Sequence, residues 1–266
     1  MVEELVDVGG HELHVRVDGP QDAPWIAFSN SILTDLHVWD AQVAALGGRY
    51  RTLRYDQRGH GLSPATGAKV SLPDLGGDLD ALLRHFHIDR CTLVGLSMGV
   101  PTVLDAHSRA PSRTAALILC DGQAATVAGG AKGWARRIET AEQGGMSAAA
   151  TDAVERWFAE DFRAAGRADR TFRTAADMSL DGFRGAASAL QDYDYKHVLN
   201  DIDCPTLLIA GANDAALIPS VEALHAAIAG SRMVRIGGAG HLPNVEQPHE
   251  FNIAFLEFLG RASPRS

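Results

Sequence analysis

Residues 91–99 read CTLVGLSMG, an apolar run of strand length followed by a serine with a glycine two positions away on each side. Gly95 and Gly99 remove the Cβ atoms where a strand and a following helix approach each other, so Ser97 can adopt a strained turn. The stretch therefore predicts a strand, a sharp turn and a helix. The Ser97 hydroxyl is expected at the helix N-terminus, where unpaired N–H groups favour negative charge.

The alternation of strand and helix extends on both sides of this turn. Residues 5–8 and 11–17 flank a Gly-Gly turn and predict a hairpin. Strands alternating with long helices form a parallel sheet covered on both faces, so the predicted fold class is α/β with a mostly parallel sheet. Further strands are expected at 25–28, 50–55, 91–96, 115–120, 204–211 and 232–236, and helices at 39–46, 74–86, 98–108, 220–229 and 246–259.

Residues 123–195 break this rhythm. They are rich in alanine, arginine and acidic residues at helical spacing, with few β-branched residues, and predict about four helices and no strand. Helical stretches include 134–141, 148–159 and 186–193. We therefore expect one α/β core, formed by 1–122 and 196–266, that is interrupted by a helical insertion at 123–195.

Composition and charge argue against several classes of function. The 266 residues can bury a core without a metal or a disulfide. The net charge of −9, with arginines interleaved among acids, argues against nucleic-acid binding. The apolar runs are too short for a membrane span, and the acidic N-terminus is unlike a signal peptide. Cys91, Cys120 and Cys204 form no CxxC pair and are expected to be buried reduced thiols, which fits the cytoplasm.

A serine hydroxyl needs a base to become a nucleophile, and the base needs an acid to orient it. His241 follows the last predicted strand in a tight loop, and Asp214 follows the strand before it. Ligand sites of α/β sheets lie at this carboxyl edge. The order Ser97, Asp214, His241 is that of the α/β-hydrolase triad. His60 is the alternative base and Asp121 the alternative acid.

Seven other histidines fall on predicted hairpin or helix positions, where ordinary surface or interface residues are expected. They are His11, His14, His85, His87, His107, His225 and His249.

An acyl-transfer site also needs hydrogen-bond donors for the developing oxyanion. The backbone N–H of Met98, directly after Ser97, is one candidate. The second is expected in the loop after the strand 25–28, and the N–H of Ile32 is favoured. The sequence shows neither a metal-ligand spacing nor a glycine-rich phosphate loop, so no metal and no cofactor are expected.

Motifs along nearly the whole chain resemble the 3-oxoadipate enol-lactonase family of the α/β-hydrolase superfamily. The SNS stretch with Trp39 is the most specific of them. The matching residues are SNS at 29–31, TDL at 34–36, Trp39, LRYD at 53–56, RGHG at 58–61, GLSMG at 95–99, Trp134, Arg137, GM at 145–146, AG at 210–211, Asp214, His241 and NVE at 244–246.

The resemblance implies that 123–195 is a cap over a pocket for a small enol-lactone bearing a carboxylate. Trp134 and Arg137 fall at matching positions in the cap, and a guanidinium can bind a carboxylate through two hydrogen bonds. An exposed helix arginine is the alternative for Arg137. Leu33 and Val100 stand where the family has glycine, and both are expected to add bulk near the reactive centre.

The sequence thus predicts a cofactor-free Ser-His-Asp hydrolase that acts on a small-molecule lactone or ester, and it leaves the oligomeric state open. The same triad could act on an amide, an acyl-homoserine lactone or a C–C bond of a ring-cleavage product, because fold analogy does not separate these. A ligand-binding or signalling protein on the same scaffold is the non-enzymatic alternative.

Overall fold

The computed structural model describes residues 1–67 and 69–262. Within these residues the strands form one eight-stranded sheet in the order β1-β2-β4-β3-β5-β6-β7-β8. The pairs β1–β2 and β2–β4 are antiparallel, and all the others are parallel. The predicted fold class is confirmed. The strands are β1 Val2–Asp7, β2 Glu12–Asp18, β3 Trp25–Ser29, β4 Arg51–Tyr55, β5 Cys91–Leu96, β6 Thr114–Cys120, β7 Thr206–Gly211 and β8 Arg232–Ile236.

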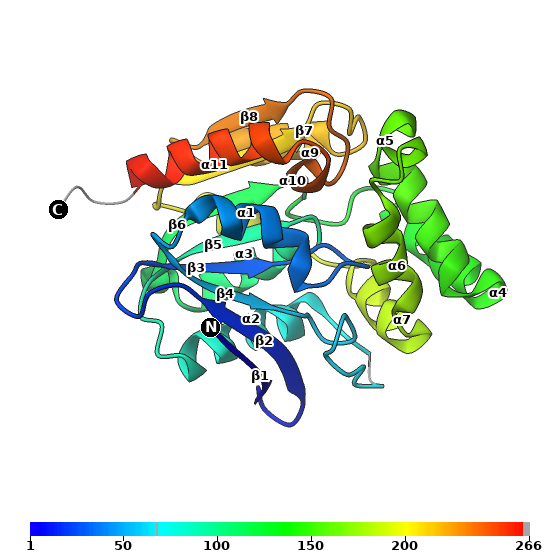
Figure 1. The fold of residues 1–266 in the computed structure, drawn as a ribbon, viewed down its shortest axis with the longest axis horizontal. Helices are drawn as coiled ribbons and strands as arrows, with labels where there is room; N and C mark the ends of the chain where they lie inside the picture. The colour runs from blue at the N-terminus through cyan, green and yellow to red at the C-terminus, as the bar shows by residue number, and fades with distance from the viewer. Residues whose placement is uncertain (68, 263–266) are drawn as a thin grey trace.

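Helices cover both faces of this sheet. In Figure 1, α1 and α11 lie in front of it and α2 lies behind. Helix α3 packs beside α2 and against β3 and β5. The helices of the core are α1 Asp40–Leu46, α2 Leu72–His85, α3 Gly99–Arg109, α8 Lys196–Leu199, α9 Ile218–Ala227, α10 Pro243–Glu246 and α11 Pro248–Ala262, with short 3-10 helices η1 Leu36–Trp39 and η2 Pro111–Arg113.

Local signals explain where these helices begin and end. Ser71 caps α2, accepting a hydrogen bond from the backbone N–H of Asp74, and the Asp74 carboxylate accepts one from the N–H of Ser71. Helix α1 ends at Gly47, whose φ of 59° is the left-handed conformation that glycine takes without strain. None of the helices in the described residues is both long and apolar enough to cross a membrane.

Residues 123–195 carry four helices, which lie beyond the carboxyl ends of the parallel strands (Figure 1). The helices are α4 Gly130–Trp157, α5 Glu160–Ala164, α6 Asp169–Asp177 and α7 Leu180–Ala189. Gly145, with φ 74° and ψ 176°, breaks α4 into two helical halves. An isolated bridge joins Ala125 to Asp194 where the chain leaves and re-enters the core.

Two predicted helices have the wrong boundaries. The helix expected at 186–193 is α7, which ends at Ala189, before the turn that leads back to the core. The helix expected at 246–259 is α11, which begins at Pro248, and Glu246 belongs to the separate short helix α10. Pro248 begins α11 and has no N–H, so the helical hydrogen bonds cannot run through this position.

The prediction for two histidines is also wrong, because His14 and His107 are buried. His14 on β2 lies with Nδ1 2.8 Å from the Asp56 carboxylate, and this hydrogen bond raises the pKa of His14. Nδ1 of His107 lies 2.9 Å from the Thr114 hydroxyl, and burial lowers the pKa of His107. Both imidazoles have hydrogen-bond partners, which explains why the core accepts them.

Candidate active site

Ser97 stands on the sharp turn between β5 and α3. Its φ is 55°, a left-handed conformation that is rare outside glycine. A Cβ on Gly95 would lie 2.3 Å from the carbonyl oxygen of Gly99, and one on Gly99 would lie 2.2 Å from that of Ser29. The two flanking glycines are therefore required by close backbone approach, as the sequence predicts.

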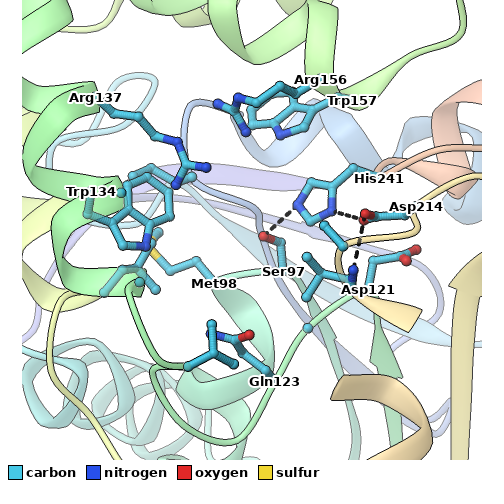
Figure 2. Close-up of a pocket in the computed structure, with 18 of the residues that line it drawn as sticks. Ser97, Met98, Asp121, Gln123, Trp134, Arg137, Arg156, Trp157, Asp214 and His241 are labelled. Atoms are coloured by element: carbon cyan, nitrogen blue, oxygen red, sulfur yellow. Dashed lines mark hydrogen bonds and ion pairs between the residues drawn. The ribbon is translucent and has the colours of Figure 1, made fainter. Parts of the chain in front are cut away.

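The carboxyl ends of β5, β7 and β8 bring Ser97, Asp214 and His241 together (Figure 2). The Nε2 atom of His241 lies 2.9 Å from the Ser97 hydroxyl. The Nδ1 atom lies 2.6 Å from Oδ2 of Asp214. These three side chains, remote in sequence, form one continuous chain of hydrogen bonds.

The loop that carries Ile32 is fixed by buried polar contacts. Asn30 accepts a hydrogen bond of 2.9 Å from the Trp39 indole and donates one of 2.7 Å to the carbonyl of Tyr55. Ile32 and Met98 both line the cavity in front of Ser97. Within the described residues, neither backbone N–H donates a hydrogen bond to another protein group. Both amides are therefore available to an oxygen placed beside Ser97.

The two departures from the family pattern have different consequences. Leu33 lines the cavity and has a φ of 62°, the conformation that favours glycine. Val100 is fully buried, and it packs so closely on Gly122 that a Cβ on Gly122 would lie 2.4 Å from Val100 Cγ2. Val100 does not itself line the cavity but packs against Gly122, which does, so its bulk lies behind the cavity wall, whereas Leu33 adds bulk at the wall itself.

A cavity of about 570 Å³ opens in front of Ser97. Trp134 and Arg137, on the first half of α4, both line it. The Arg137 guanidinium lies over the Trp134 ring at 4.4 Å from its centroid. Burial, together with the charge of Arg156, lowers the pKa of Arg137 to about 10. In the described residues, Arg137 forms no ion pair.

Other residues of the cavity were not anticipated. Arg156 and Trp157, from the second half of α4, line the wall beside His241 (Figure 2). Arg156 pairs with Asp152 at 2.9 Å. The sequence spacing does not indicate that Arg156 lines a cavity, because Arg156 and Asp152 are spaced like an ordinary ion pair on an exposed helix face. Gln123 lines the opposite side.

The alternative base is not part of the site. His60 is buried, with Nδ1 3.2 Å from the carbonyl oxygen of Arg58, and it does not line the cavity. Burial lowers the pKa of His60. Its neighbour Arg58 forms a two-point ion pair with Asp78, so this loop is held by its own contacts.

Asp121, the alternative acid, lies next to Asp214. Asp121 is fully buried after β6, and its carboxylate accepts a hydrogen bond of 3.0 Å from the N–H of Gly211. Burial, reinforced by the nearby charge of Asp214, raises the pKa of Asp121 well above its ordinary value. Ligand atoms of Asp121, Asp214 and His241 lie within 4.8 Å of one another, as in a metal site. Both His241 nitrogens, however, already have partners.

The raised pKa of Asp121 predicts a pH-dependent stability. The folded protein holds this proton more tightly than the unfolded chain does. The free energy of unfolding should therefore decrease as the pH rises above about 4, until the folded-state pKa is passed. Asp121→Asn should remove this contribution, as measured by urea unfolding between pH 4 and 9. Exposed Asp192→Asn should keep the wild-type curve, and an unchanged curve for Asp121→Asn would contradict the assignment.

Comparison with known proteins identifies the family of this chain. The sequence matches the alpha/beta hydrolase family over residues 29–254, and the chain belongs to that family. It is 34% identical to 3-oxoadipate enol-lactonase 1 of Acinetobacter baylyi, over 94% of each chain. The structure matches a hydrolase of Pseudomonas aeruginosa with a TM-score of 0.91 and 36% identity, covering 97% of this chain and 98% of the other. It matches the enol-lactonase of Burkholderia xenovorans with a TM-score of 0.90 and 34% identity, covering 97% and 100%. These similarities support hydrolysis of a lactone or ester.

Proposed function

We propose that this protein is a serine hydrolase that cleaves a small, carboxylate-bearing lactone or ester through an acyl-enzyme. The observation that carries the proposal is the hydrogen-bonded chain from Ser97 through His241 to Asp214 at the base of a cavity. The similarity to the two named enol-lactonases supports a lactone resembling 3-oxoadipate enol-lactone.

The proposed reaction has two halves. Nε2 of His241 takes the Ser97 proton as the hydroxyl oxygen attacks the carbonyl carbon, and Asp214 stabilises the resulting imidazolium. The N–H groups of Ile32 and Met98 donate hydrogen bonds to the oxyanion. Collapse breaks the acyl C–O bond, and His241 gives its proton to the leaving enol or alcohol. Water, deprotonated by His241, then attacks the acyl-enzyme and releases the acid and Ser97.

We propose that residues 123–195 form the cap over this site and that Arg137 binds the substrate carboxylate. The Arg137 guanidinium lines the cavity without an ion-pair partner in the described residues, and its burial weakens competition from water. A guanidinium presents two parallel N–H groups to a carboxylate. The Trp134 ring packs against the guanidinium and supports its orientation.

Arg137→Met should lower kcat/KM for a carboxylate-bearing lactone by about 10- to 100-fold, because a hydrogen bond to a charged group contributes about 1.5–3 kcal/mol. Turnover of the neutral p-nitrophenyl acetate should stay within about twofold, since this ester has no carboxylate for Arg137 to bind. Arg136→Met, at the exposed neighbouring position, is the matched control. Equal losses on both substrates would contradict the assigned role.

The whole proposal is tested by labelling with a fluorophosphonate and by turnover of enol-lactones, p-nitrophenyl esters, amides, acyl-homoserine lactones and vinylogous ketones. We expect labelling of Ser97 and the highest kcat/KM on a carboxylate-bearing enol-lactone. Faster turnover of another substrate class would replace the lactone. A protein that is neither labelled nor active on any of them would be a binding protein.

A further inference from the structure

Glu246 ends α10, five residues after His241, and its side chain is buried with 1% exposure. Its two carboxylate oxygens have different partners. Oε1 accepts a hydrogen bond of 2.9 Å from the backbone N–H of Ala159. Oε2 accepts one of 2.6 Å from the backbone N–H of Gly240. The proposed reaction uses none of these groups.

Burying an ionised carboxylate is energetically unfavourable. Removing an ionised group from water costs several kcal/mol unless other groups replace the lost hydration. Within residues 1–67 and 69–262, the Glu246 carboxylate has no ion-pair partner, and the two backbone amides are its hydrogen-bond donors. A side chain needed only for packing would be apolar. The Glu246 carboxylate instead accepts hydrogen bonds from two different segments, which indicates a role in joining them.

The two amides belong to segments that meet at the proposed base. Ala159 lies two residues after α4, the helix that forms the cavity wall. Gly240 directly precedes His241. A second bond ties the same segments, because the N–H of His241 donates to the carbonyl of Trp157 at 2.9 Å. The Trp157 and His241 rings also pack against each other, with 5.8 Å between their centroids. The two side chains lie next to each other in Figure 2.

Gly240 fits this junction by having no side chain. A Cβ there would lie 2.3 Å from the Trp157 carbonyl oxygen and 3.4 Å from Oε2 of Glu246. The His241 loop is thus pressed against the end of α4, with the Glu246 carboxylate bridging the two segments.

We propose that Glu246 is a positioning residue that fixes His241 to the end of α4, so that the helix lining the substrate cavity also sets the distance between the imidazole and Ser97. This inference rests on the proposed function, in which His241 is the base. Glu246 does not touch the reacting atoms and acts only through the backbone of the His241 loop.

Glu246→Gln tests the bridge while preserving side-chain size. An amide has one acceptor oxygen, so one backbone N–H would face an NH₂ group instead. We expect kcat to decrease by about 10- to 100-fold, as for a small misplacement of a reacting group. KM for the carboxylate-bearing lactone should stay within about twofold, because Arg137 is untouched. Glu250→Gln, on the exposed face of α11, should behave as wild type.

A second variant leaves Glu246 in place. Ala159 has φ −61° and follows Phe158 at φ −125° and ψ 148°, a backbone that accepts proline at 159. Ala159→Pro removes the N–H that Oε1 binds, and its ring displaces the carboxylate. It should lower kcat as Glu246→Gln does, and the double variant should lose little more than either single one. Glu160→Pro, the first residue of α5, is the matched control.

Two readouts separate positioning from mere stabilisation. Rates are normalised to fluorophosphonate-labelled sites well below the unfolding temperature, so that only folded protein counts. Hydrogen exchange of 236–246 is followed without substrate, and we expect faster exchange in both variants than in their controls. Lowered thermal stability with unchanged kcat per site would overturn the proposal, as would unchanged exchange. If the wild type itself is inactive and unlabelled, the proposed function fails, and the exchange result still decides whether Glu246 holds the loop.

Discussion

Replacing Ser97 with alanine should lower kcat/KM for the preferred lactone or ester by about 10⁴- to 10⁶-fold, the range seen when a serine hydrolase loses its nucleophile. Without the hydroxyl no acyl-enzyme forms, and the oxyanion donors and the cavity can support only slow direct attack by water. The measurement is steady-state hydrolysis together with fluorophosphonate labelling, which should be abolished.

The fold should survive this substitution. Alanine loses only the hydroxyl, and the backbone at position 97 is held by its N–H, which donates to the carbonyl of Cys120 at 2.8 Å. Thermal unfolding should therefore stay close to wild type. Ser108→Ala, near the other end of α3, is the matched control and should keep full activity. Near-wild-type turnover by the Ser97→Ala protein would exclude Ser97 as the nucleophile.

The second large effect is expected at Asp214. Asp214→Asn should lower kcat by about 10⁴-fold, as the corresponding change does in other Ser-His-Asp enzymes. An asparagine NH₂ group directed at Nδ1 favours the tautomer with the proton on Nε2, which cannot accept the Ser97 proton. The loss should be measured as kcat across the pH range, with exposed Asp192→Asn as the control.

Asp121 is a second acid that could orient His241 when Asp214 is replaced. It lies within reach of His241 and Asp214, so it is the one described carboxyl placed to substitute for Asp214. Asp214→Asn that retains more than about a tenth of wild-type activity would contradict Asp214 as the orienting acid. Loss of that residual activity in Asp121→Asn/Asp214→Asn would then assign the role to Asp121.

Short-range patterns predicted the parts of the fold that depend on neighbouring residues. The apolar run at 91–96 and the two glycines around Ser97 act over a few residues, and both appear in the structure as expected. Placing His241 and Asp214 at the site needed one further rule, that parallel strands end at the same edge of a sheet. The break between α10 and α11 was missed although Pro248 signals it.

The remaining features depend on contacts between distant segments. Nothing in the spacing of Arg156 distinguishes a cavity wall from a solvated helix face, because that depends on how α4 lies over the sheet. Glu246 reads as one acid of an NVE motif, and its role emerges only when residues 159 and 240 meet around it. The burial of His14 likewise depends on Asp56, 42 residues away.

The break in α4 at Gly145 separates the part of the helix that lines the cavity with Trp134 and Arg137 from the part that contacts His241. Trp134 and Arg137 stand on the first half, whereas Trp157, at the end of the second, receives the hydrogen bond from His241. If the entire helix rose to admit a ligand, it would carry the imidazole away from the nucleophile. Swinging only the first half, about the glycine, would widen the entrance and leave the proton relay assembled. The cavity could then open to a ligand without moving His241 away from Ser97.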